Sequence, residues 1–164
     1  MMKKEVPVVI DLFCGTGGLS EGFRQAGFKS ILGIDIDKSA LETFALNHKG
    51  AETICGDISK ITKEQIIEKI KRKSVDLVIG GPPCQGFSLA GRRNPNDPRN
   101  QLVKEFLRIV KDFQPKFFVI ENVHGFRSMK DENGKLVMDI VKELSKESGY
   151  HVKPYLLNSK DYSV

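Results

Sequence analysis

The residue best suited to covalent chemistry in this sequence is Cys84. It comes after an apolar run at residues 77–79, two glycines and two prolines, and directly before a polar and basic segment. Prolines cannot continue a β ladder, and they fix the path of the chain as it leaves a strand. A thiol there would lie outside the carboxyl end of a buried strand, where parallel sheets carry their chemistry. A buried structural cysteine is the alternative, and this stretch alone does not decide between the two.

A carboxylate and an amide, Glu121 and Asn122, follow another apolar run at residues 117–120. A carboxylate that ends a buried strand is costly unless it is neutral, paired or used in chemistry. Glu121 is therefore a candidate catalytic group with a raised pKa, and Asn122 could hold it by hydrogen bonds. The alternative is that Glu121 only caps the segment that follows.

A glycine-rich turn at residues 14–18 predicts a nucleotide-like ligand close to the backbone. The spacing differs from G-x-G-x-x-G because position 20 is Ser, and no G-K-[ST] follows. Asp35 comes 18 residues after Gly17, close to the spacing of about 20 at which an acidic residue meets a ribose hydroxyl. Asp57 ends the next strand and could accept from an adenine amino group. Glycines used for packing and aspartates used as helix caps are the alternatives.

The alternation of apolar runs and amphipathic segments predicts an α/β fold with a doubly wound, mostly parallel sheet. Strands are expected at residues 6–13, 30–34, 53–55, 77–79, 117–120 and 151–157. Helices are expected at residues 19–26, 38–47, 62–73, 100–113 and 136–144. No repeat or linker interrupts the pattern, so residues 1–164 are expected to form one domain.

The composition restricts the function classes. The net charge of +5 is modest support for a polyanionic partner. Three cysteines without a C-x-x-C pair and three scattered histidines predict a reduced protein without a metal site. No apolar run is as long as the roughly 18 residues of a membrane span. Arg92, Arg93 and Arg99 follow Cys84 in a loop and suit phosphate contacts, although a solvated loop would look the same.

Six short motifs, in this order, resemble those of the DNA (cytosine-5)-methyltransferase family. They are D-L-F-C-G-T-G-G at 11–18, G-I-D-I-D at 33–37, G-D-I at 56–58, G-P-P-C-Q-G-F-S at 81–88, D-P-R-N-Q-L at 97–102 and E-N-V at 121–123. The resemblance covers residues 6–164. It implies a Rossmann-like, S-adenosylmethionine-dependent methyltransferase whose sheet is incomplete at the C-terminus.

The resemblance also implies roles for individual residues. The Cys84 thiolate would attack C6 of a cytosine flipped out of duplex DNA, while Glu121, with Asn122 in the same motif, contacts the base. S-adenosylmethionine would methylate C5, and loss of the C5 proton would release Cys84. The implied cofactor contacts are Phe13, Gly15, Gly17, Asp35, Ile36, Asp57, Ile58, Pro83 and Leu102. The implied DNA contacts are Gln85, Ser88, Arg92, Arg93 and Arg99.

The resemblance departs at residues 157–164, where the family continues into a Gln-x-Arg-x-Arg motif, a target-recognition domain and a final helix. Ser163 also stands where the family usually has Gly. We expect a split or truncated enzyme, weak or inactive alone, that is completed by a second polypeptide or by self-association. We expect the protein to be located in the prokaryotic cytoplasm and to act at the nucleoid. An RNA (transfer RNA) cytosine-5-methyltransferase and a non-catalytic cofactor-binding module are the alternatives.

Overall fold

The computed structural model describes residues 5–83, 101–131 and 133–162. Within these residues one sheet has the strand order β3-β2-β1-β4-β5, and every neighbouring pair is parallel. Its strands are β1 (Val8–Leu12), β2 (Lys29–Asp35), β3 (Glu52–Cys55), β4 (Leu77–Gly80) and β5 (Phe117–Ile120). The predicted doubly wound parallel sheet is confirmed. The strand order reverses between β1 and β4, which is where such sheets bind their ligands.

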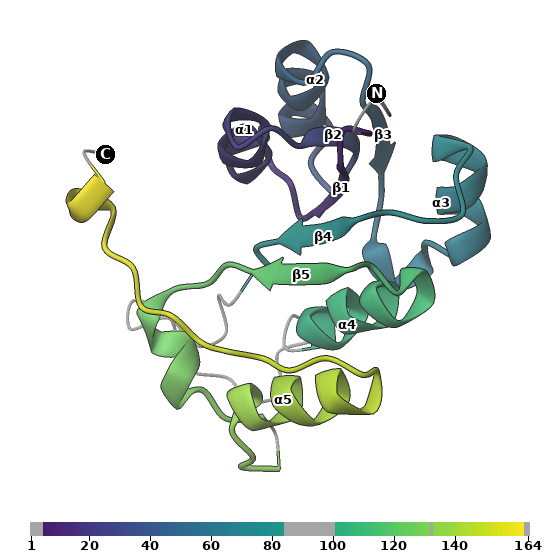
Figure 1. The fold of residues 1–164 in the computed structure, drawn as a ribbon. Helices are drawn as coiled ribbons and strands as arrows, with labels where there is room; N and C mark the ends of the chain where they lie inside the picture. Colours follow the sequence, from purple (N-terminus) through teal and green to yellow (C-terminus); the bar gives the residue numbers. More distant parts are fainter. Residues whose placement is uncertain (1–4, 84–100, 132, 163–164) are drawn as a thin grey trace.

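Helices cover both faces of the sheet (Figure 1). On one face lie α1 (Gly18–Gln25) and α2 (Lys38–Asn47), and on the other lie α3 (Lys63–Ile70), α4 (Leu102–Phe113) and α5 (Val137–Glu147). Short 3-10 helices η1 (Ile58–Lys60) and η4 (His124–Ser128) follow β3 and β5, and η5 (Ser159–Tyr162) lies in the C-terminal segment. The resulting three layers hold the carboxyl ends of the strands at one common edge.

The side chains of β1 alternate between two cores. Ile10 and Leu12 join the larger core beneath α4, and Val9 packs with Leu77 and Ile79 against α1. Burying each such side chain stabilises the fold by about 1.5–3 kcal/mol. One side of α4 is buried, through Val103, Phe106, Leu107, Ile109, Val110 and Phe113. The central strands are therefore rigid supports for the residues that follow them.

Two sequence predictions differ from the structure. The helix expected at 62–73 begins with a Thr62 capping box and ends at Ile70, because Lys71 adopts a left-handed φ of 52°. The strand expected at 151–157 does not form, so that prediction was wrong. Tyr150 anchors the start of this segment by donating from Oη to Pro115 O at 2.5 Å, but Tyr155, Leu156 and Leu157 are exposed. A strand needs a neighbour, and this segment pairs with none in the described chain.

β5 is the edge strand of the described sheet, and its side chains are only partly covered. Phe117 is 45% exposed and Val119 is 37% exposed. The ring of Phe117 meets Phe28 edge-on at 6.3 Å, so one side of it is packed and the other faces outward. One apolar side of β5 is therefore uncovered in the described part of the chain. Within the described residues, no helix is both long and apolar enough to cross a membrane.

Candidate functional site

The turn after β1 is held by hydrogen bonds to β2. Cys14 N donates to Ile34 O at 3.1 Å, and Gly15 N donates to Asp35 Oδ2 at 2.8 Å. Phe13, Gly15 and Gly17 all have positive φ, at 58°, 51° and 93°. Glycine adopts such angles without a steric penalty, whereas Phe13 does so under strain. The turn is therefore a fixed structure, and the carboxylate of Asp35 is part of what fixes it.

Asp35 uses both carboxylate oxygens within the protein. Oδ2 accepts from Gly15 N, and Oδ1 accepts from Asp37 N at 2.9 Å. Each oxygen can accept a second hydrogen bond, so Asp35 can still receive a ribose hydroxyl. Ile36, the next residue, is 75% exposed. An exposed apolar side chain beside this carboxylate suits the flat face of an aromatic base.

The end of β3 is fixed from two directions. Asp57 caps η1 by accepting from Ser59 N at 3.0 Å and Ser59 Oγ at 2.8 Å, and these bonds lower the pKa of its carboxyl. Arg108 of α4 donates from Nη2 to Ile58 O at 2.9 Å and to Ile61 O at 3.1 Å. The side chain of Ile58 lies in the core, so it would meet a cofactor through its backbone. Asp57 therefore caps a helix, as the alternative interpretation expected. The residue remains partly exposed beyond the carboxyl end of β3.

The chain leaving β4 is fastened to the chain leaving β5. Glu121 N donates to Gly80 O at 2.9 Å, and Asn122 Nδ2 donates to Pro82 O at 3.1 Å. A Cβ atom on Gly81 would lie 2.9 Å from Glu121 Oε2. The carboxylate of Glu121 therefore lies over Gly81, three residues before Cys84. The ends of β4 and β5 therefore lie side by side.

Two details of the Glu121 prediction were wrong. Glu121 is exposed rather than buried, because β5 is at the edge of the sheet and the residue lies beyond the strand. Asn122 does not hold Glu121. Its side chain is shared between Pro82 O and the backbone of Val123, whose N donates to Asn122 Oδ1 at 2.9 Å.

A buried carboxyl, Asp11, lies within β1 under α1. It is 1% exposed, and Ser20 Oγ donates to its Oδ2 at 2.7 Å while Ser30 Oγ donates to Ser20 Oγ at 2.9 Å. Oδ1 has no hydrogen-bond partner in the described structure. Burial raises the pKa of Asp11 to about 7, the bonds from Ser20 oppose the rise, and the charge of Asp35 adds to it. The site thus contains a carboxyl that is neutral below this pH.

The two described cysteines differ in exposure. Cys14 is buried, and burial followed by the charges of Asp11 and Asp35 raises the pKa of its thiol. Such a thiol is unreactive. Cys55 is exposed at the end of β3, with Sγ 3.6 Å from Ile36 O. The predicted nucleophile Cys84 and the predicted DNA contacts Gln85, Ser88, Arg92, Arg93 and Arg99 lie outside the described residues.

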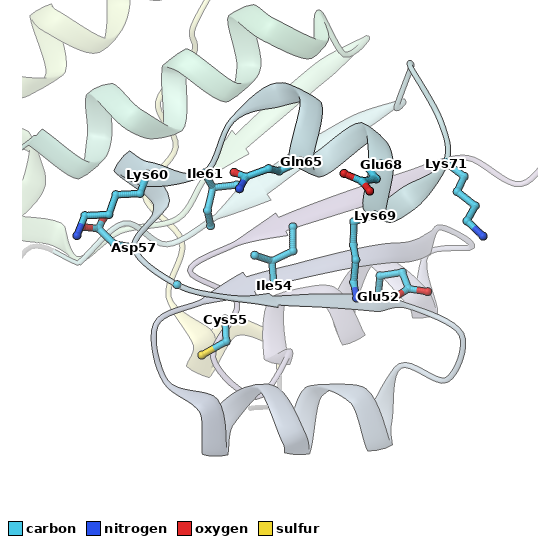
Figure 2. A pocket seen from close by; sticks show the side chains of 11 residues that line it. Glu52, Ile54, Cys55, Asp57, Lys60, Ile61, Gln65, Glu68, Lys69 and Lys71 are labelled. Atoms are coloured by element: carbon cyan, nitrogen blue, oxygen red, sulfur yellow. Dashed lines mark ion pairs between the residues drawn. The ribbon is translucent and has the colours of Figure 1, made fainter.

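Two pockets lie beside β3 and β2. One, of about 670 Å³, lies between β3 and α3, where Glu52 and Lys69 form an ion pair at 3.2 Å (Figure 2). Ile54 points toward α3 and Cys55 to the opposite side of β3. The other, of about 740 Å³, includes Gly17 and His48. Among the described residues predicted to hold the cofactor, some line these pockets and the others lie at the carboxyl ends of the strands. They do not line one closed cavity. Pro83 and Leu102 are half-buried and stand in the sequence on either side of residues 84–100.

Three structural residues of the site were not predicted from the sequence. Asp11 could have been noticed, because a carboxylate interrupts the apolar run V-V-I-D-L. Arg108 and His48 carry no such signal, since a charged residue on a helix and a lone histidine are ordinary features. Their contacts, to Ile58 O and to Gly17 O, depend on the packing of distant elements.

The fold and the strand-end residues define the class of the protein, a Rossmann-like methyltransferase domain. A model of the C-5 cytosine-specific DNA methylase family matches residues 8–164, so the chain belongs to this family. The chain is 47% identical over 156 residues to the Type II methyltransferase M.DdeI of Desulfomicrobium norvegicum, covering 95% of this chain and 37% of the relative. It is 43% identical to M.AquIA of a Picosynechococcus strain, covering 95% of this chain and 66% of the relative.

Solved structures agree with this family. A structure described as an Escherichia coli prophage-encoded DNA modification methyltransferase superimposes with a TM-score of 0.72 and 38% identity, covering 86% of this chain and 38% of that one. A Spodoptera frugiperda DNMT2 mutant gives a TM-score of 0.60 and 26% identity, covering 85% and 41%. This chain spans only part of the length of all these proteins.

Proposed function

We propose that this chain is the catalytic, cofactor-binding part of a DNA (cytosine-5)-methyltransferase of a restriction-modification system. The observation that carries the proposal is the fastening of Glu121 and Asn122 to residues 80–82. This arrangement brings a carboxylate next to the segment that leads to Cys84. A thiol and a carboxylate on neighbouring strand ends are what attack on a flipped cytosine requires.

In the proposed reaction the Cys84 thiolate adds to C6 of the cytosine. Glu121 contacts N3 and the exocyclic amine. This contact stabilises the adduct in which C5 of the cytosine is nucleophilic. C5 forms the bond to the transferred methyl group, and a base then removes the C5 proton as the bond between Cys84 and C6 breaks. Asn122 keeps the Pro82 backbone in place throughout, because its amide bonds Pro82 O.

The residues at the carboxyl ends of β1, β2 and β3 fit S-adenosylmethionine, which supplies the methyl group from its sulfonium when bound. A Cβ on Gly15 would meet no heavy atom of the described chain within 4 Å, so the space beside the turn is open. We propose Phe13, Gly15 and Gly17 at the methionine portion, Asp35 at the ribose and Ile36 against the adenine. Asp57, Ile58, Pro83 and Leu102 would complete the contacts.

We propose that Gln85, Ser88, Arg92, Arg93 and Arg99 contact the DNA. We also propose that a second polypeptide, or a second copy of the chain, covers the edge of β5. The exposed Phe117 and Val119 support this, as do the exposed residues Val123, Tyr155, Leu156, Leu157 and Tyr162. An apolar edge strand of this kind favours association.

Transfer of labelled methyl groups to duplex DNA and to transfer RNA tests the function. The assay is run with the chain alone and with a polypeptide that carries the Gln-x-Arg-x-Arg motif and a recognition domain. We expect methylation of duplex DNA, increased by the second polypeptide. Methylation of transfer RNA alone would favour the RNA alternative. Binding of S-adenosylmethionine without methylation of either acceptor would favour a non-catalytic module.

A further inference from the structure

His48 follows α2, yet its ring lies beside the glycine turn after β1. The residue is 6% exposed, and Nε2 lies 3.1 Å from Gly17 O. A carbonyl oxygen can only accept, so the ring proton must be on Nε2 for this bond to form. His48 is thus a buried hydrogen-bond donor to the turn, contributed by a different helix.

Gly17 is shaped to receive this ring. A Cβ at position 17 would lie 2.3 Å from His48 Nε2 and 2.6 Å from His48 Cδ2, distances that no side chain could occupy. The His48 ring also packs on Phe44, with ring centroids 4.6 Å apart, and the same Cβ would lie 2.8 Å from Phe44 Cδ2. Both rings therefore contact the Gly17 backbone, and this packing fixes the direction of the His48 ring.

The Gly17 carbonyl also begins α1. Glu21 N donates to Gly17 O at 2.9 Å, so the oxygen accepts from both the helix and His48. Gly17 N in turn donates to Cys14 O at 2.9 Å. Asp35 holds the turn at Gly15, and His48 holds it at Gly17. These two attachments set the direction of the backbone between them.

We propose that His48 is a positioning residue for the methyl-donor cofactor, because it fixes Gly17 and so the path of residues 15–17. This inference rests on the proposed function, in which the turn contacts the methionine portion of S-adenosylmethionine. Removal of the His48 donor leaves the Gly17 carbonyl with the bond from Glu21 N and loosens the turn, while the fold around it remains.

Two substitutions separate the hydrogen bond from packing. His48→Leu keeps apolar volume against Phe44 and removes the donor. His48→Gln keeps a donor, because the glutamine Nε2 can reach the position of the histidine Nε2. Leu41→Ala is the matched control, since Leu41 belongs to the same buried cluster as Cys14 and Phe44 and its side chain makes no hydrogen bond.

Calorimetry gives the Kd for S-adenosylmethionine, and NMR gives amide hydrogen exchange at Gly15, Gly17 and Glu21. We expect His48→Leu to weaken binding about tenfold and to speed exchange at these amides, as loss of one buried hydrogen bond would. His48→Gln should stay within about threefold of the parent. Leu41→Ala should lower the melting temperature and leave the Kd unchanged.

The outcomes that overturn the inference are distinct from those that overturn the proposed function. Parent-like binding and exchange in His48→Leu, or equal losses in His48→Gln and His48→Leu, contradict the positioning role. A parent chain that binds no S-adenosylmethionine contradicts the proposed function, and exchange alone then decides whether His48 holds the turn. If His48→Leu does not fold, nitrogen NMR of the parent remains decisive, because a proton on Nδ1 rather than Nε2 excludes the bond.

Discussion

Asn122 donates from Nδ2 to Pro82 O at 3.1 Å, and this bond joins the end of β5 to the chain that leaves β4. Pro82 has no N–H and Pro83 follows it, so this segment cannot be held by its own backbone donors. The side chain of Asn122 supplies a donor from the neighbouring strand end. The position of the segment before Cys84 therefore depends on a residue 40 positions further along the chain.

Asn122→Ala should lower the rate of methyl transfer about tenfold to a hundredfold, because the segment before Cys84 loses one of its attachments. Stability should fall by only about 1 kcal/mol, the net contribution of one partly exposed hydrogen bond. The measurements are single-turnover methyl transfer and urea unfolding. Asn133→Ala, which alters an exposed loop amide, serves as the control. Parent-like transfer in Asn122→Ala would show that the bond has no role in the reaction.

Gly80 and Gly81 should respond differently to alanine. A Cβ on Gly80 would lie 2.2 Å from Leu12 O in the neighbouring strand, so Gly80→Ala should destabilise the fold by about 3 kcal/mol. A Cβ on Gly81 would meet Glu121 Oε2, the end of a flexible side chain. The free energy of unfolding of Gly81→Ala should therefore lie within about 1 kcal/mol of the parent value. Its rate of methyl transfer should still fall about tenfold. Equal losses of stability in both variants would contradict the proposed contact between Gly81 and Glu121.

Asp11 should make stability depend on pH. Its pKa is about 7 in the fold, against 3.8 for an unperturbed side chain. Between these values the folded protein keeps a proton that the unfolded chain releases, so this contribution is complete below about pH 4 and is lost as pH rises to about 7. The slope is at most about 1.4 kcal/mol per pH unit.

Asp11→Asn tests this dependence, because the amide is neutral at every pH. Urea unfolding between pH 4 and 8 should show the parent losing stability relative to Asp11→Asn as pH rises. Other carboxyls titrate in both proteins, so the difference isolates Asp11. Asp161→Asn, at an exposed position, should run parallel to the parent. A constant difference between the parent and Asp11→Asn would mean that Asp11 is ionised throughout.

Arg108 should matter for both stability and cofactor affinity. It bonds Ile58 O and Ile61 O from α4 and also pairs with Glu105 at 2.7 Å. Arg108→Leu removes the charged donors to η1 and should cost about 2 kcal/mol. Arg108→Lys should recover only part of this, because lysine lacks the planar fork. Urea unfolding and the Kd for S-adenosylmethionine measure the two effects. An unchanged Kd in Arg108→Leu would separate η1 from the cofactor site.

The exposed side of β5 should determine association. Replacing Phe117 and Val119 together by serine removes the apolar surface without changing the hydrogen bonds of the strand. We expect weaker association with a second copy or with the second polypeptide, measured by light scattering over a concentration series. Lys130→Ser, at an exposed residue away from β5, is the control. An unchanged mass distribution would contradict an interface at this edge.

The sequence predicts the sheet well because apolar runs mark most of its strands. Residues 77–79 and 117–120 are examples, and the parallel pairing of these two strands brings Glu121 to Gly81. The missing strand at 151–157 shows the limit. Its composition suits a strand, but strand formation depends on a partner that no local pattern reveals.

The functional contacts were less predictable than the fold. The spacing of Asp35 to Gly17 makes it a candidate ribose contact, but its bond to Gly15 N follows from the register of β1 and β2 and carries no sequence signal. Glu121 was expected to be buried, and it is exposed because β5 is at the edge of the described sheet. His48 reaches Gly17 only because α1 and α2 lie on the same face. Contacts between elements distant in sequence need the folded structure.

The central claim is that Cys84 is the nucleophile, and covalent trapping tests it most directly. The chain, S-adenosylmethionine, the second polypeptide and a duplex containing 5-fluorocytosine are mixed, and mass spectrometry locates the adduct. Because fluorine blocks the final loss from C5, the bond to the thiol should persist. We predict an adduct on Cys84 that is absent in Cys84→Ser and retained in Cys55→Ser, the control at the exposed thiol. An adduct that survives Cys84→Ser would contradict the account.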